Sequence, residues 1–374
     1  MIIFVMSNGA DHRVSITPEI VKKLVSAGHE VKIEKGAGLP SFIKDEDYTQ
    51  AGALSVKTTK ETVKTADVVL AVRLPYSEPK GGWTANIDKG ATVISLMNPH
   101  ANKDFLQKLA ERGVNLFALE LIPRTTRAQS MDVLSSQANL AGYKAVIEAA
   151  DVYSSMFPMM MTAAGTVAAA RVLVIGAGVA GLQAIATARR LGAVVSAFDV
   201  RSAAKEQVES LGAKFVEVDT QEAGDGGGGY AKEMSAEYKK KQSEKLAEAV
   251  KKSDIVITTA QIPGKPAPVL VTKEMVESMQ SKSVIVDLAT ESGGNCELSK
   301  LDEKVLHNGV TIIGYANMAG RIPHDASKLF SKNVFNFLQL LIKDNKLSVD
   351  TSDDIIIASL LAYNGKTTEV FAKL

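Results

Sequence analysis

Three glycines and one carboxylate in this chain have the spacing of a dinucleotide site. Gly176, Gly178 and Gly181 form the pattern G-x-G-x-x-G, and Asp199 follows roughly 20 residues later. Such glycines permit a tight turn, leave room for a pyrophosphate against bare backbone, and let a helix pack closely on a strand. The later carboxylate accepts hydrogen bonds from both hydroxyls of an adenosine ribose. Because it also repels a 2′-phosphate, these residues predict binding of NAD(H) rather than NADP(H).

The residues around the glycines predict the strand–helix–strand unit that this chemistry needs. Apolar runs and helical spacing indicate a strand, a helix and a second strand at residues 171–175, 182–191 and 194–198. The helix begins just after the glycines, so its amino end offers unpaired N–H groups to phosphates. A turn that binds nothing is the alternative interpretation. Arg201 could attract a 2′-phosphate, but Asp199 stands at the strand end itself and is taken to decide.

A second polar segment connects the last strand of the first domain to a long predicted helix. It contains Arg124, Gln129, Asp132 and Ser135, of which the last two are three residues apart and share a helix face. A guanidinium, an amide, a carboxylate and a hydroxyl can together bind a flat polar ring such as a nicotinamide carboxamide. Helix capping with surface ion pairs is the alternative.

Groups that could take a proton from an alcohol or an amine are scarce near these segments. A His or Lys usually does this work, and of the five histidines only His100 follows a strand at the expected cleft. His29 and His307 are expected in solvated turns. The single cysteine, Cys296, is expected in a loop after a strand rather than at a reacting centre. No His, Cys and Asp cluster has metal-ligand spacing, so no metal site is predicted.

The composition is that of an ordinary globular protein. The 374 residues suggest two domains, and a net charge of +1 gives no field that would recruit nucleic acid. One cysteine excludes an internal disulfide framework. Residues 156–170 are the best membrane candidate, but they contain Pro158 and fall short of about 20 apolar residues. Residues 1–5 read as a strand rather than as a secretion signal. The expected location is therefore cytoplasmic or on an equivalent matrix side.

Alternating strands and helices predict an α/β fold with two Rossmann-like domains joined by long helices. Strands of the first domain are predicted at residues 2–6, 31–34, 68–72, 93–97 and 116–120, with helices at 17–27 and 103–112. Six strands of the second are predicted at 171–175, 194–198, 215–218, 255–258, 284–288 and 311–314. Long helices are expected at 131–156 and 326–341, with residues 355–361 at the edge of the first domain. The first domain, residues 1–132 plus 326–374, is thus discontinuous, and the dinucleotide domain, residues 133–325, is inserted in it. The cleft of the two is expected to hold the chemistry.

Four consecutive glycines interrupt the second domain. Residues 224–230 end in Gly229 and Tyr230 and precede a charged stretch. A flexible surface insertion is one interpretation. The other is a lid that folds Tyr230 over a bound nucleotide and expels water.

With these motifs the chain resembles the alanine dehydrogenase and nicotinamide nucleotide transhydrogenase family, and most closely the NAD(H)-binding domain I, or soluble alpha subunit, of proton-translocating transhydrogenases. The resemblance covers nearly the whole chain. Its most specific parts are residues 124–137, 157–166, 176–192, 208–212, 229–234 and 262–269.

The resemblance implies a role for each candidate residue. Those that would position the dihydronicotinamide ring are Arg124, Gln129, Asp132 and Ser135, while Tyr230 would close over NADH. The pyrophosphate would lie on Ala177, Gly178 and Val179 beside Gly176 and Gly181. Asp199, Val200 and Arg201 would hold the adenosine ribose, and Gly229, Thr259 and Gln261 would line the rest. Gln261 departs from the apolar residue that the family more often has.

The resemblance also implies partners. The chain would form a homodimer and pass hydride from NADH to NADP⁺ bound on a separate domain III. That assembly would dock on domain II, a transmembrane proton channel, so the chain would be peripheral to the membrane without inserting into it.

Two other functions stay open. Alanine dehydrogenases of the same group use a catalytic Lys and His, and these positions fall at Arg73 and Asn98 here. An NAD-dependent amino-acid dehydrogenase is therefore the first alternative. A regulatory or adaptor subunit that responds to NAD(H) is the second, and it would have no use for Gln129.

Overall fold

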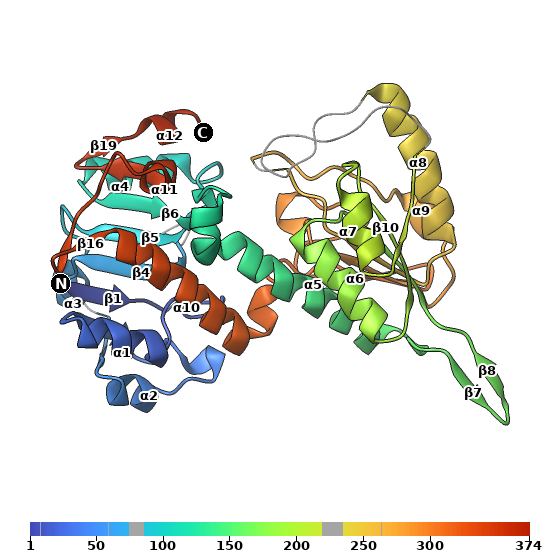
Figure 1. Cartoon of the computed structure of the whole chain (residues 1–374), viewed down its shortest axis with the longest axis horizontal. Coiled ribbons are helices and arrows are strands. Elements are labelled where there is room, and N and C mark those ends of the chain that lie inside the picture. The colour runs from blue at the N-terminus through green and yellow to red at the C-terminus, as the bar shows by residue number, and fades with distance from the viewer. Residues whose placement is uncertain (8, 59, 75–85, 219–234, 263) are drawn as a thin grey trace. The chain divides into compact units, whose positions relative to one another are not determined.

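A computed structural model describes residues 1–7, 9–58, 60–74, 86–218, 235–262 and 264–374. The chain divides into two compact units (Figure 1). Unit 1 comprises residues 1–137 and 320–374, and unit 2 comprises residues 138–319. Helix α5 (Val133–Val152) begins in unit 1 and continues into unit 2. It is shorter than the predicted helix at 131–156, because the helix starts only after Asp132.

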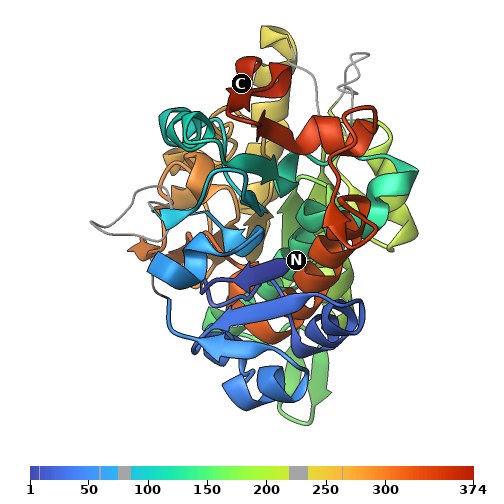
Figure 2. The same ribbon diagram turned by 90° about the vertical axis from the view of Figure 1, so that its left-hand side faces the viewer.

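Unit 1 contains an eight-stranded sheet in the order β19-β18-β6-β5-β4-β1-β2-β3. The strands are β1 (Ile2–Val5), β2 (Glu30–Glu34), β3 (Leu54–Val56), β4 (Val68–Arg73), β5 (Thr92–Leu96), β6 (Asn115–Ala118), β18 (Leu360–Tyr363) and β19 (Lys366–Thr367). Strands β1 to β6 are parallel, and β18 pairs antiparallel with β6. Chain residues from both ends of the sequence therefore build one sheet, which faces the viewer in Figure 2.

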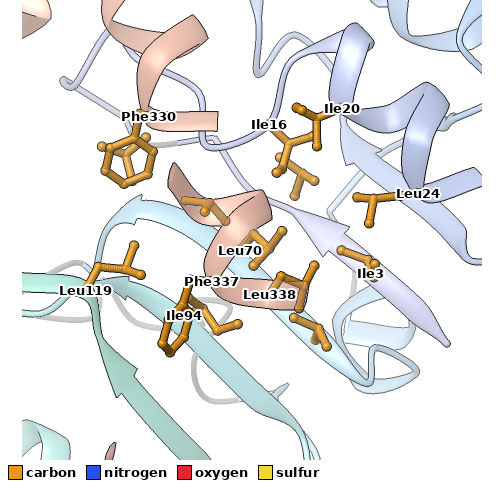
Figure 3. Close-up of a cluster of buried hydrophobic side chains, with 14 of the residues drawn as sticks. Ile3, Ile16, Ile20, Leu24, Leu70, Ile94, Leu119, Phe330, Phe337 and Leu338 are labelled. Carbon is orange, nitrogen blue, oxygen red and sulfur yellow. The ribbon is translucent and has the colours of Figure 1, made fainter. Parts of the chain in front are cut away.

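Helices cover both faces of this sheet. Its helical segments are α1 (Pro18–Ser26), η1 (Leu39–Ser41), α2 (Asp45–Gln50), α3 (Lys60–Lys64), α4 (Lys103–Glu111), η3 (Leu119–Leu121), η4 (Thr126–Met131), α10 (Pro323–Leu340), α11 (Asp354–Ser359) and α12 (Glu369–Ala372). A short hairpin, β16 (Ile342–Lys343) with β17 (Lys346–Leu347), follows α10. On one face, Phe337 and Leu338 of α10 pack with Ile3, Leu70 and Ile94 of the strands (Figure 3). Successive strand residues face opposite sides, so each β1 residue after Ile2 is buried in one of two cores.

Unit 2 contains a seven-stranded sheet in the order β11-β10-β9-β12-β13-β15-β14. The strands are β9 (Arg171–Ile175), β10 (Val194–Phe198), β11 (Lys214–Phe215), β12 (Ile255–Thr258), β13 (Val284–Asp287), β14 (Lys304–His307) and β15 (Val310–Ile313). The helical segments are α6 (Val179–Arg190), α7 (Ala204–Ser210), α8 (Ala236–Lys251), α9 (Lys273–Glu277), η6 (Thr290–Ser292) and η7 (Ala319–Arg321), the last at the unit boundary. Two apolar cores cover the two faces, so the parallel strands are buried on both sides.

An exposed hairpin also belongs to unit 2. It joins β7 (Met160–Thr162) to β8 (Gly165–Val167), and Figure 1 shows it extending away from the rest of that unit. The segment that the sequence offered as the best membrane candidate thus contains a hairpin. Among the described residues, every helix is too short or too polar to cross a bilayer.

The predicted α/β fold with two Rossmann-like domains is confirmed, because in both sheets the six parallel strands, numbered along the chain, have the order 3-2-1-4-5-6. The histidine predictions were wrong. His307 lies in β14, an antiparallel strand that the sequence did not indicate, and pairs with Glu277. His29 is only 4% exposed, because the turn after α1 folds against the sheet.

Candidate functional site

The carboxyl ends of four strands of unit 2 lie in register. Ile175 of β9 stands opposite Phe198 of β10 on one side and Thr258 of β12 on the other, and Thr258 stands opposite Asp287. The residues that follow each strand therefore meet at one edge of the sheet. In open α/β sheets ligands bind at this edge, at the point where the strand order reverses. Here that point lies between β9 and β12.

The three glycines of the loop after β9 have different physical roles. At Gly176 the backbone has φ +99°, which favours glycine, and an added Cβ would lie 2.5 Å from the Thr259 hydroxyl oxygen. At Gly181 it would lie 1.8 Å from the carbonyl oxygen of Gly176, so α6 could not approach β9. At Gly178 it would meet nothing within 4 Å. Packing thus explains two glycines, and the open space at the third fits the predicted approach of a pyrophosphate.

Asp199 directly follows β10 and reaches back to the glycine loop. Its Oδ2 accepts a hydrogen bond from the Ala177 N–H at 2.7 Å. The guanidinium of Arg201 donates to both carboxylate oxygens, at 2.9 Å from Nε and 2.8 Å from Nη2. The Arg201 N–H donates to Oδ1 as well. Arg201, which the sequence left as a possible attractor for a 2′-phosphate, is therefore paired with Asp199, and Val200 lies between them, partly buried.

The loop after β12 is held against the glycine loop. The Thr259 hydroxyl donates to the carbonyl oxygen of Gly176 at 3.0 Å. Gln261 is exposed, and its Nε2 donates to the Leu288 carbonyl oxygen at 3.0 Å. Thr259 and Gln261 thus lie at the same edge as Val179 and Asp199, and the polar side chain of Gln261 has a structural hydrogen bond.

The second polar segment lies in unit 1, around η4. Arg124 and Gln129 are exposed. Asp132 precedes α5 and caps it, because its carboxylate accepts hydrogen bonds from the N–H of Ser135 at 2.8 Å and from its hydroxyl at 2.6 Å. Helix capping, the alternative interpretation of this pair, is therefore present in the structure. It fixes both side chains at the start of the helix.

Two further contacts anchor η4 within unit 1. The carbonyl oxygen of Ser130 accepts hydrogen bonds from the side-chain amides of Asn333, at 2.8 Å, and Asn336, at 3.0 Å, both on α10. Arg127 forms a two-pronged ion pair with Asp353, which in turn caps α11. Gln129 thus extends from a segment whose backbone is tied at both sides.

Asp353→Ala is expected to lower the free energy of unfolding by about 1 kcal/mol near neutral pH, because it removes a helix cap. Arg127 holds the pKa of Asp353 down at about 2, below its ordinary value of 3.8. A carboxyl with a lowered pKa stabilises the fold above its unfolded pKa and loses that contribution as the pH falls through its folded pKa. Urea unfolding should show a constant difference from wild type at about pH 5 to 7 that shrinks below about pH 4. A difference that stays undiminished at the acid end would contradict this assignment.

Sequence reasoning missed two buried carboxyl groups at the carboxyl edge of the unit 1 sheet. Arg13, 3% exposed, donates to both oxygens of Asp11 and to the side-chain oxygen of Gln137. Burial raises the pKa of Asp11, but the hydrogen bonds and charge of Arg13 outweigh this and hold it below its ordinary value. Glu120 accepts hydrogen bonds from the N–H groups of Met97 and Asn98, and burial raises its pKa. Asn98 has φ +43°, which fits its close approach to this carboxyl.

The remaining candidates resolve differently. Tyr230 and Gly229 lie outside the described residues. Cys296 is buried, and burial raises the pKa of its thiol to about 11, so it is a poor nucleophile at neutral pH. Within the described ranges, no three His, Cys, Asp or Glu side chains form a group that could hold a metal ion.

The two domains of one known family match this fold. Residues 7–141 match the N-terminal domain and residues 145–370 the C-terminal domain of alanine dehydrogenase/PNT. The chain therefore belongs to the alanine dehydrogenase/PNT family, as the sequence predicted.

Within that family the chain is most like subunits of transhydrogenases. It is 52% identical over 360 residues to an NAD(P) transhydrogenase subunit alpha of Rhodospirillum rubrum, covering 95% of this chain and 94% of that protein. It superposes on the crystal structure of the transhydrogenase from Sinorhizobium meliloti with a TM-score of 0.88 at 49% identity, covering 98% and 100% of the two chains. An L-alanine dehydrogenase shares the fold, with a TM-score of 0.81 at 24% identity and coverage of 100% and 99%.

Proposed function

We propose that this chain is the NAD(H)-binding subunit of a proton-translocating NAD(P) transhydrogenase. The glycine loop of unit 2 carries the proposal, because Gly178 leaves open backbone at the amino end of α6 while Asp199 stands beside it. These features fit a dinucleotide that has a free 2′-hydroxyl. The 52% identity to a transhydrogenase subunit, against 24% to an alanine dehydrogenase, favours the transhydrogenase within the family.

Each candidate residue has a role in this proposal. The N–H groups of Ala177, Gly178 and Val179 bind the pyrophosphate at the amino end of α6. Asp199 accepts the ribose hydroxyls, which replace the side-chain donors of Arg201, since those donors already use lone pairs of the carboxylate. The nicotinamide ring is assigned, on the family resemblance, to Arg124, Gln129, Asp132 and Ser135, with Tyr230 closing over it.

The chemistry proposed is hydride transfer from NADH to NADP⁺ held by a partner protein, giving NAD⁺ and NADPH. No O–H or N–H proton has to be removed in this exchange, so no general base is needed at the ring. The positions where alanine dehydrogenases have a catalytic Lys and His are Arg73 and Asn98 in this chain. The contribution of the chain is then to bind, orient and shield the ring from water. A transmembrane partner would couple the exchange to proton movement, so this subunit would be peripheral to the membrane.

The chain alone is expected to bind NADH and to show negligible transhydrogenation, and adding a cognate NADP(H)-binding protein should restore it. Deuterium placed at C4 of NADH should then appear in NADPH by mass spectrometry. Full activity without a partner would refute the proposal. NAD-dependent deamination of alanine at ordinary enzymatic rates would establish the amino-acid dehydrogenase instead. Unchanged exchange by Gln129→Asn in the reconstituted complex would favour the adaptor subunit.

We also propose that the chain is a homodimer in which the β7–β8 hairpin contacts a second copy. Met160 and Met161 on this hairpin are exposed, and an isolated two-stranded hairpin is marginally stable in water. Met161→Lys should shift the sedimentation coefficient from that of a dimer to that of a monomer. Leu306→Lys is the matched control, because Leu306 is equally exposed on β14 of the same unit. A monomeric wild type, or a Met161→Lys variant that stays dimeric, would count against this arrangement.

A further inference from the structure

One buried side chain connects the turn after β13 to the loop after β12. The Oδ1 of Asn295 accepts a hydrogen bond from the Ala260 N–H at 2.9 Å. Its Nδ2 donates to the carbonyl oxygens of Ala260, at 2.9 Å, and of Pro268, at 2.8 Å. Asn295 is completely buried. Both backbone polar groups of Ala260 are therefore bound by a single side chain.

Asn295 is itself fixed by Asp287 at the end of β13. One oxygen of this buried carboxylate accepts hydrogen bonds from the N–H groups of Asn295, at 2.8 Å, and Cys296, at 2.9 Å, and from the Ser299 hydroxyl at 2.6 Å. The turn has no space for a side chain at Gly294, where φ is +89° and a Cβ would lie 2.9 Å from the Asp287 carboxylate. The glycine before Asn295 thus lets the turn wrap tightly around Asp287.

The Asn295 contact completes a series of anchors along the loop after β12. Thr259 bonds to the glycine loop, Ala260 to Asn295, and Gln261 to the Leu288 carbonyl oxygen. Three successive residues are held by three different segments of unit 2. A loop held in this way loses little further freedom when a ligand binds to it.

The position of this loop in the sheet indicates which half of a dinucleotide it faces. A dinucleotide lies across the point where the strand order reverses, with one mononucleotide on each side. Asp199 follows β10, on the β9 side, and is the residue that fits the adenosine ribose. Ala260 follows β12, on the other side, and so faces the nicotinamide half.

We propose that Asn295 is a positioning residue for the nicotinamide half of NAD(H), acting through the backbone of Ala260. This inference rests on the proposed NAD(H) binding by unit 2. It assigns to Asn295, held by Asp287, the task of presenting the loop after β12 in one conformation, while the adenosine half depends on the glycine loop and Asp199.

The test is to compare two ligands in the full chain carrying Asn295→Ala, with binding measured by calorimetry. The Kd for NADH should rise about tenfold or more, while the Kd for 5′-AMP, which lacks the nicotinamide half, should stay within about twofold. The control is Asn115→Ala. Asn115 is a buried asparagine of unit 1 that bonds to Gly90, Thr92 and Asn364, and its loss should leave both affinities unchanged.

The outcomes separate the possibilities. An unchanged Kd for NADH, or equal weakening of NADH and 5′-AMP, overturns the proposal, since the latter is what a general structural role predicts. A wild-type chain that fails to bind NADH refutes the proposed function instead. If Asn295→Ala does not fold, Ala260→Gly tests the same loop without removing a side-chain hydrogen bond. Its added backbone freedom should weaken NADH about threefold and leave 5′-AMP unaffected.

Discussion

Gly181→Ala is expected to abolish measurable NADH binding and to destabilise unit 2, whereas Gly178→Ala should weaken binding in a protein of unchanged stability. The Cβ of an alanine at 181 would stand 1.8 Å from the Gly176 carbonyl oxygen, so α6 must move away from β9. Overpacking of this kind costs about 1–3 kcal/mol or more. At 178 the same methyl group meets no protein atom within 4 Å but occupies the space where a pyrophosphate would approach the backbone.

The pair of variants separates packing from binding. NADH affinity by fluorescence titration and melting temperature should both fall for Gly181→Ala, while only affinity should fall for Gly178→Ala. Full NADH affinity in Gly178→Ala would mean that the glycine loop does not hold the pyrophosphate. A normal melting temperature in Gly181→Ala would mean that α6 and β9 tolerate a wider separation than the structure indicates.

Asp287→Asn should lower the free energy of unfolding by about 3 kcal/mol or more. The carboxylate of Asp287 accepts five hydrogen bonds, from the Thr258 and Ser299 hydroxyls and from three backbone N–H groups. An amide has one accepting oxygen, so at least one buried N–H of this set must face an NH₂ group. The loss of that hydrogen bond, together with the desolvated donor, accounts for the size of the effect.

Urea unfolding followed by circular dichroism measures this effect. Asp151→Asn is the matched control, because Asp151 is exposed on α5 and its change should stay within about 0.5 kcal/mol. Equal stability of Asp287→Asn and wild type would show that the turn after β13 does not need its carboxylate, and would remove the support that Asp287 gives to Asn295.

Features that depend on neighbouring residues were predictable from the sequence. The strand, glycine loop and helix around Gly176 are local, and their periodicity and turn chemistry agree with the structure. The two-domain α/β fold followed from the alternation of apolar runs. The roles of the individual site residues stay predictions.

Features that depend on distant partners were not predictable. The bond from Asn295 to Ala260 joins residues 35 positions apart, and Asn295 reads locally as a turn residue. Arg201 looked able to bind a phosphate because nothing in the sequence shows that its side chain turns back to Asp199. Strand β14 was missed because it is an edge strand whose Leu306 is largely exposed, so its pattern lacks a buried face.

The sheet of unit 1 has a consequence for how the protein emerges from the ribosome. Strand β18 and helix α10 complete this sheet and one of its cores, yet they are synthesised after all of unit 2. Unit 2 comprises one continuous stretch of chain and can therefore fold during translation, while residues 1–137 must wait with apolar surface uncovered. Pulse-labelled nascent chains stopped before residue 320 should accordingly be protected from protease in unit 2 and cut within the first 137 residues.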